Sequence, residues 1–139
     1  MPRKLSVVLA ALALGVLSAA GSARAADLVY VSGPGGPFVG YTVPAIVVAQ
    51  GDNLTYINMD AFPHDVIARH SGPETDWCLA AGIKDKLPGV QGCPLFWSSL
   101  IGITQQTPVL GLENIEPGAT YTFFCSIHAN MEGTLVALP

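Results

Sequence analysis

The sequence predicts an all-β domain with one short helix in a long insert. After residue 25 the chain is rich in Val, Thr, Tyr, Phe and Gly, and turn residues divide it into segments of strand length. Between about residues 69 and 108 this rhythm fails, and so long a stretch without structure would be unusual in a compact domain. We therefore expect a β domain interrupted by an insert with some structure of its own.

The first 25 residues predict a secretory signal peptide. Arg3 and Lys4 give a basic start, Leu5 to Leu17 is an almost unbroken apolar run, and Ser22 to Ala25 offers a cleavage site. An uncleaved anchor is the alternative, but the run is shorter than the roughly 20 residues that span a bilayer. Residues 26–139 are thus expected to form a single exported domain, periplasmic or otherwise extracytoplasmic, without stable membrane insertion.

The strands follow one another between turn signals. We expect them at 27–31, 44–49, 54–59, 64–68, 120–125 and 134–138, with returns to strand at 97–103 and 109–112. The run Gly33 to Pro37 is expected to be irregular. Side chains alternate along a strand, so Tyr121, Phe123 and Cys125 share one face, which the two aromatic rings mark as the core face.

The insert is expected to hold a helix from about residue 72 to residue 81. Ser71 and Glu74 resemble a capping box, and Gly82 can end the helix. The chain has three cysteines, and in an oxidising compartment cysteines tend to pair. The economical pairing is Cys78 with Cys93, 15 positions apart, although the sequence does not exclude the other pairings.

The charge balance argues against a nucleic-acid partner. Three of the six basic residues lie in the predicted signal peptide, and all ten acidic residues follow it. The mature chain is therefore negatively charged, whereas nucleic-acid binding needs basic side chains to neutralise phosphates.

A cysteine, a histidine and a methionine follow one another at three-residue spacing in "FFCSIHANMEG", as Cys125, His128 and Met131. Along an extended strand this spacing would place neighbours about 10 Å apart on opposite faces, so the strand must end at Cys125 and curl. Thiolate, imidazole and thioether together form a soft donor set that suits copper. Zinc would have little use for the methionine.

A second histidine would complete a copper site, and His64 is the better candidate. It follows Pro63 and opens a strand, whereas His70 has no cysteine or methionine clustered beside it and is expected to be a loop residue. The segments "NMDAFPHDV" and "GATYTFFCSIHANMEG" resemble the cupredoxins of the plastocyanin and amicyanin type. The resemblance covers most of the mature chain outside the insert.

This resemblance implies a Greek-key β-sandwich holding one type 1 copper per chain. It implies His64, Cys125, His128 and Met131 as the ligands, and it implies that Asp65 braces the ligand loop near Ser126. The position of Asp65 is commonly asparagine in the family, so a carboxylate there is a departure that could change the reduction potential. The insert at residues 69–108 is a second departure, because it could cover or create a docking surface.

The expected function is that of an exported, monomeric carrier of one electron, not an enzyme. The partner would be a redox protein such as a cytochrome or another copper protein. The alternative is a copper carrier or resistance protein that hands the ion over. A multicopper enzyme would need more histidines than the three in this chain.

Overall fold

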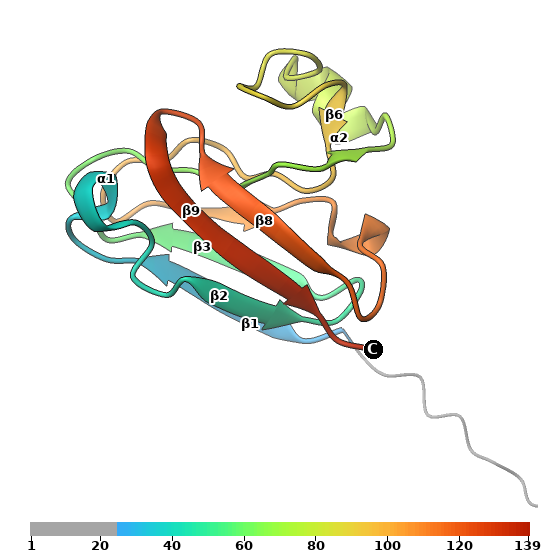
Figure 1. Cartoon of the computed structure of the whole chain (residues 1–139), viewed down its shortest axis with the longest axis horizontal. Coiled ribbons are helices and arrows are strands. Elements are labelled where there is room, and N and C mark those ends of the chain that lie inside the picture. The colour runs from blue at the N-terminus through green and yellow to red at the C-terminus, as the bar shows by residue number, and fades with distance from the viewer. Residues whose placement is uncertain (1–24) are drawn as a thin grey trace, which may run out of the picture.

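Two β-sheets face each other in the computed structural model, which describes residues 25–139 (Figure 1). Strands β1 (Asp27–Ser32), β3 (Asn53–Asn58) and β7 (Gln106–Val109) form one sheet in the order β1-β3-β7. Strands β2 (Ala45–Val48), β9 (His128–Ala137), β8 (Thr120–Cys125) and β4 (Ile67–Ala68) form the other in the order β2-β9-β8-β4. The predicted all-β sandwich is confirmed, while the predicted signal peptide lies, except for Ala25, outside the described residues.

The pairing of the strands places the last residue of β8 and the first residue of β9 together at one end of the sandwich. Strand β8 runs antiparallel to β9, and the register shifts between Phe124 and Cys125, so that Cys125 pairs with His128. Strand β2 is parallel to β9, and β1 is parallel to β3. The turn between β8 and β9 is thus tight, and α1 (Gly36–Val39) lies at the same end of the molecule (Figure 1).

The core lies between the two sheets and is rich in aromatic side chains. Tyr30, Tyr56 and Phe123 are almost fully buried, and the rings of Tyr41 and Phe123 lie 4.9 Å apart, centre to centre. Tyr121, Phe123 and Cys125 all belong to this main core, as the alternation along the strand predicted. Burial of these large side chains is the main source of stability in a domain of this size.

The insert forms a lobe beside the sandwich, closed by the predicted disulfide between Cys78 and Cys93. Its helix α2 runs only over Asp76–Ala81, so the prediction of a start at residue 72 was wrong. Ser71 and Gly72 instead form strand β5 (Ser71–Gly72), which pairs with β6 (Cys93–Pro94), and the side chain of Thr75 caps the helix. Gly82 ends the helix in a left-handed conformation, as expected.

Four other segments differ from the prediction. Helix α1 occupies part of the stretch expected to be irregular, because proline is tolerated in the first turn of a helix, where Pro37 stands. Strand β9 begins at His128, six residues before the predicted start, so that Met131 lies in a strand. Strand β4 covers only Ile67–Ala68, and the expected strand at 97–103 contributes only isolated bridges, His64 with Ile101 and Trp97 with its partners.

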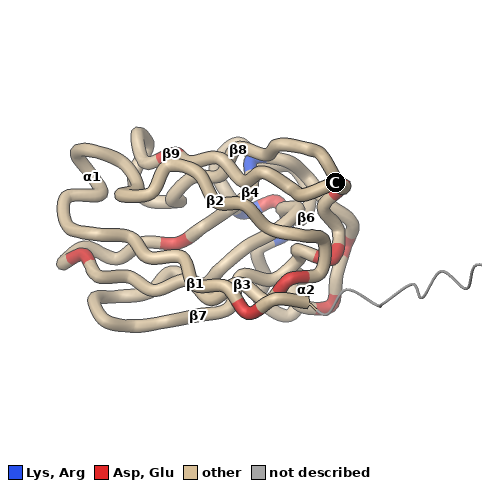
Figure 2. Tube along the Cα trace, turned by 90° about the horizontal axis from the view of Figure 1, so that it is seen from below, with Lys and Arg blue, Asp and Glu red and all other residues tan. Residues whose placement is uncertain are grey.

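The strand expected at 109–112 lies earlier, as β7 at Gln106–Val109, and a short 3₁₀ helix (Leu112–Asn114) follows it. Most acidic positions lie toward the end of the sandwich that carries the C terminus, away from α1 (Figure 2). Among residues 25–139, none of the helices has the length and apolar character needed to cross a membrane.

Candidate metal centre

His64 is held at the end of the sandwich by its backbone. Its N–H donates to the carbonyl of Ile101 at 3.0 Å, and the N–H of Ile101 donates back to the carbonyl of His64 at the same distance. The preceding turn is fixed by Asn58, whose side-chain amide donates to the carbonyl oxygens of Phe62 and Ile101. The His64 side chain is fully buried, so its ring has one defined position rather than a range of exposed rotamers.

Cys125 and His128 come from the two strands that meet at the β8–β9 turn. Cys125 is the last residue of β8 and is buried, whereas His128 is the first residue of β9 and is half-buried. The turn between them is tied to the segment of His64 by Asp65. One carboxylate oxygen of Asp65 accepts the backbone N–H of Ser126 at 2.7 Å, and the other accepts the Ser126 hydroxyl.

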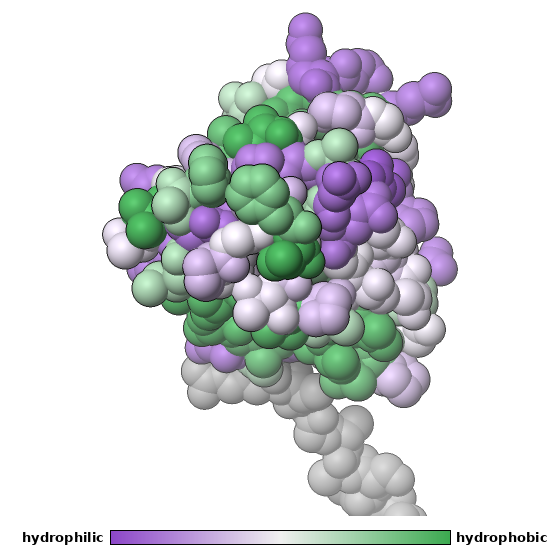
Figure 3. Space-filling model, turned by 60° about the vertical axis from the view of Figure 1, so that its left-hand side comes forward, coloured by the Kyte–Doolittle hydropathy of each residue, from purple (hydrophilic) through white to green (hydrophobic). Residues whose placement is uncertain are grey.

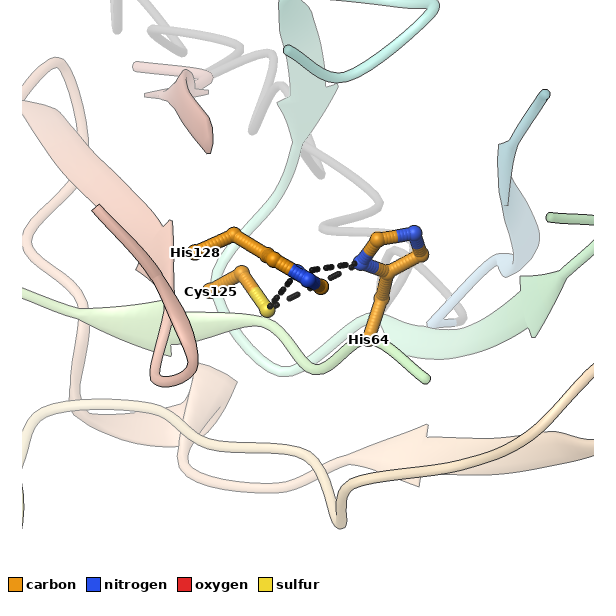
Figure 4. Close-up of side chains that lie close together, drawn as sticks. All are labelled: His64, Cys125 and His128. Atoms are coloured by element: carbon orange, nitrogen blue, oxygen red, sulfur yellow. Dashed lines mark hydrogen bonds between the residues drawn. The ribbon is translucent and has the colours of Figure 1, made fainter. Parts of the chain in front are cut away.

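The three side chains converge on one point (Figure 4). The Nδ1 atoms of His64 and His128 are 3.1 Å apart, and the Sγ of Cys125 lies 3.8 Å from the first and 3.4 Å from the second. A point equidistant from these three atoms lies about 2.0 Å from each, the circumradius of that triangle. Protein-bound zinc, for comparison, lies about 2.0–2.1 Å from histidine nitrogen and about 2.3 Å from cysteine sulfur. The triangle therefore has the size that a first-row metal ion requires.

Met131 is also buried at this end of the sandwich. A Cβ built on Gly36 would lie 3.0 Å from the terminal methyl of Met131 and 2.9 Å from Nε2 of His64, so Met131 packs against the same spot as the His64 ring. Two imidazole nitrogens and one thiolate, together with a methionine as a weak fourth ligand, are the donor types of the copper sites used in electron transfer. His70 is exposed and packs edge-on to Tyr121, and it takes no part in the cluster found among the described residues.

In the metal-free cluster, burial disfavours the charged forms of Cys125 and His128. Burial raises the pKa of the Cys125 thiol to about 11, and the nearby Asp65 carboxylate adds to the effect. Burial also lowers the pKa of His128, and the neighbouring His64 ring lowers it further. A metal ion that binds here must therefore displace the proton of the thiol but meets a neutral imidazole at His128.

One residue of this site, Asp60, was missed from the sequence. Asp60 is buried, and its Oδ2 lies 3.0 Å from Nε2 of His64 and accepts the N–H of Gly36 at 2.7 Å. Burial alone would raise the pKa of Asp60, but hydrogen bonds from His64, Gly36 and Phe62 outweigh it, so its pKa lies below the usual value. The available signal was an acidic residue four positions before the candidate ligand His64, within the quoted segment "NMDAFPHDV".

The chain has the cupredoxin fold, which it shares with the solved structures described below. No family model matches the sequence. A plastocyanin of Synechococcus sp. (strain JA-2-3B'a(2-13)) is 27% identical over 134 residues, covering 95% of this chain and 87% of the relative.

Solved structures share the fold at lower identity. Reduced auracyanin of Roseiflexus castenholzii has a TM-score of 0.56 and 16% identity, covering 83% of this chain and 98% of its own. A purple cupredoxin of Nitrosopumilus maritimus has a TM-score of 0.52 and 16% identity, covering 80% of this chain and 99% of its own. An oxidised variant of amicyanin has a TM-score of 0.51 and 20% identity, covering 79% and 80%. The insert is therefore carried on a cupredoxin sandwich.

Proposed function

We propose that this protein is an exported type 1 copper protein that carries one electron between larger redox proteins. One copper per chain would be held by His64, Cys125 and His128, with Met131 as the weaker fourth ligand. The observation that carries the proposal is the triangle of two Nδ1 atoms and one Sγ, whose size fits a first-row metal ion. The cupredoxin fold and the relative named as a plastocyanin support it.

Bound copper would supply a one-electron couple between Cu(I) and Cu(II). The chain would supply a fixed, dry cage for both oxidation states. His64 and Cys125 are almost completely shielded from solvent, and the backbone pairs of His64 with Ile101 and of Cys125 with His128 hold their side chains on the sandwich. Donors held in this way limit the rearrangement that would otherwise accompany electron transfer, because they hardly move when the ion changes charge.

The exposed edge of His128 would be the exit for the electron. The ring of His128 meets the ring of Phe62 edge-on at 6.4 Å, and Phe62 in turn meets Phe38 at 6.5 Å. Phe38 on α1 is 81% exposed and Ile127 beside His128 is 52% exposed, so exposed apolar side chains lie close to this edge. The face of the molecule turned forward in Figure 3 shows apolar groups interspersed with polar ones. An apolar patch of this kind suits brief docking of a redox partner, such as a cytochrome or another copper protein.

Export and the absence of catalysis are parts of the same proposal. The Cys78–Cys93 disulfide supports an oxidising compartment, because disulfides rarely persist where thiols are kept reduced. We infer no reaction on a substrate, because His64, Cys125 and His128 all serve as metal donors. The remaining histidine, His70, is exposed and stands apart from the cluster.

The test is whether copper stays bound while it changes oxidation state. The mature protein is loaded with Cu(II), reduced with ascorbate and reoxidised through several cycles in the presence of a Cu(I) chelator, and the bound copper is measured after each cycle. We expect one copper per chain throughout and full recovery of the visible spectrum. Loss of the ion to the chelator at each reduction would contradict electron carriage and favour the copper carrier or resistance protein.

A matched pair of histidine variants provides the control. His128→Ala removes one donor of the triangle, and we expect it to lose copper during cycling. His70→Ala removes an exposed ring outside the cluster, and we expect it to behave as the unmodified protein. Equal retention by both variants would show that the copper is bound elsewhere.

A further inference from the structure

A buried carboxylate lies on the far side of the His64 ring from the donor triangle. Asp60 is 2% exposed, and its Oδ2 is 3.0 Å from Nε2 of His64, whereas Nδ1 of the same ring belongs to the triangle. A carboxylate that takes part in such contacts only accepts hydrogen bonds, so Nε2 carries the hydrogen and donates it to Asp60. The ring nitrogen that faces Cys125 and His128 is then left with its lone pair free.

The contacts of Asp60 are those of a carboxylate anion. Besides Nε2 of His64, the backbone N–H of Gly36 donates to Oδ2 at 2.7 Å, and the backbone N–H of Phe62 points to Oδ1 at 3.4 Å. Within residues 25–139, Asp60 pairs with His64 and with no lysine or arginine, since the other two ion pairs join Arg69 to Glu132 and Lys84 to Glu74. A buried negative charge without a cationic partner is costly, and a metal ion on the opposite nitrogen of His64 would compensate for it.

Gly36 makes this arrangement possible. A Cβ at this position would lie 2.9 Å from Nε2 of His64 and 3.1 Å from Oδ2 of Asp60, closer than side-chain carbons normally come to such atoms. A glycine here therefore lets the first turn of α1 cover the Asp60–His64 pair and place its N–H on the carboxylate. The pair is sealed from solvent, where its charge acts more strongly than it would in water.

We propose that Asp60 is a positioning residue of the metal centre, which fixes the tautomer of His64 and favours Cu(II) over Cu(I). This inference rests on the proposed copper function. A carboxylate bound to the distal nitrogen of a metal-ligating histidine orients the ring and makes it a stronger donor. Its negative charge also stabilises the more highly charged oxidation state of the ion, which lowers the reduction potential.

The test compares reduction potentials of three variants of the copper-loaded protein. Asp60→Asn keeps an acceptor for Nε2 but removes the charge, and Asp60→Ala removes both. We expect the preference for Cu(II) over Cu(I) to fall at least tenfold in Asp60→Asn, a rise in potential of 59 mV for each factor of ten. The control Glu116→Gln removes one exposed charge from the turn before β8 and should leave the potential unchanged. If the reduction potential of Asp60→Asn differed from that of the unmodified protein by no more than the potential of the control does, the proposal would be overturned.

A second measurement needs neither copper nor a folded variant. Nitrogen-15 NMR of the imidazole groups in the metal-free, unmodified protein reports which ring nitrogen of His64 carries the hydrogen. We expect the Nε2–H form, and observation of the Nδ1–H form would overturn the inference even if copper binds. Failure of the unmodified protein to form a thiolate–copper site would instead refute the proposed function, while the NMR result would still decide whether Asp60 sets the tautomer.

Discussion

Replacing Asp65 tests how the ligand turn is held. The residue is 3% exposed, and its two carboxylate oxygens accept the N–H and the hydroxyl of Ser126, which links the His64 segment to the turn between Cys125 and His128. Asp65→Ala removes both hydrogen bonds. Asp65→Asn keeps an oxygen for the Ser126 N–H and offers an amide N–H to the Ser126 oxygen, so the link is preserved without the charge.

The expected cost follows from these contacts. A hydrogen bond to a charged group contributes about 1.5–3 kcal/mol, and removing the carboxylate also relieves part of its own burial cost. We expect Asp65→Ala to lower the free energy of unfolding by about 2–4 kcal/mol, and Asp65→Asn by about 1 kcal/mol, which is the charge-assisted part alone. Copper affinity should fall about 10–100-fold in the alanine variant, as it does when groups that orient ligands are removed.

The assay is denaturant unfolding of the metal-free protein, followed by tryptophan fluorescence. Ser126→Ala is a matched control, because it removes only the hydroxyl bond and leaves the bond from the Ser126 N–H in place. We expect its stability to lie between those of the unmodified protein and Asp65→Ala. If the alanine and asparagine variants of Asp65 were equally stable, the link through the carboxylate would not hold the turn.

Two further predictions concern the cysteines. Replacing Cys78 and Cys93 together by alanine should lower the free energy of unfolding, measured with denaturant, by about 3 kcal/mol, the chain-entropy estimate for a 15-residue loop. The copper spectrum should stay unchanged, because neither cysteine belongs to the donor cluster. A lost spectrum would mean that the lobe supports the site. Since the pKa of the Cys125 thiol is raised to about 11, binding of copper at pH 7–9 must release the thiol proton. The apparent copper affinity, measured by competition with a chelator, should therefore fall about tenfold for each unit that the pH is lowered. An affinity independent of pH would contradict a thiolate ligand.

The strands of the sandwich were the most predictable part of the fold. Strands β1, β2 and β3 lie between turn signals, and β8 spans the predicted residues 120–125, where Tyr121 and Phe123 on one face alternate with threonines on the other. The pairing of Cys78 with Cys93 followed from their closeness in the chain and was confirmed. These features depend on local pattern, which a single sequence contains.

The parts that could not be predicted depend on contacts between distant segments. Ser71 pairs with Pro94 in a small sheet, and this pairing overrides the local capping signal. Thr75 caps the helix instead, so α2 begins at Asp76. Strand β9 extends back to His128 because β8 lies beside it, although the segment "HANMEG" has no alternation of its own.

The candidate donors could be named from spacing, but their surroundings could not. Cys125, His128 and Met131 are close in the chain, and His64 was preferred to His70 because it follows Pro63 and opens a predicted strand, a choice that the resemblance supported. The contact of Asp60 with His64 depends on the turn at Phe62 and Pro63 and on the N–H of Gly36, which comes from α1, a helix that the sequence did not predict. Groups that orient a ligand thus emerge only when the packing around it is known.

The most direct test of the copper site is the visible and EPR spectrum of the mature protein loaded with Cu(II), compared with that of Cys125→Ser. We predict an intense blue or green thiolate-to-copper band in the unmodified protein and its loss in the serine variant, which keeps both histidines. A pale, ordinary copper spectrum in the unmodified protein, or a band that survives the loss of the Cys125 sulfur, would contradict the account.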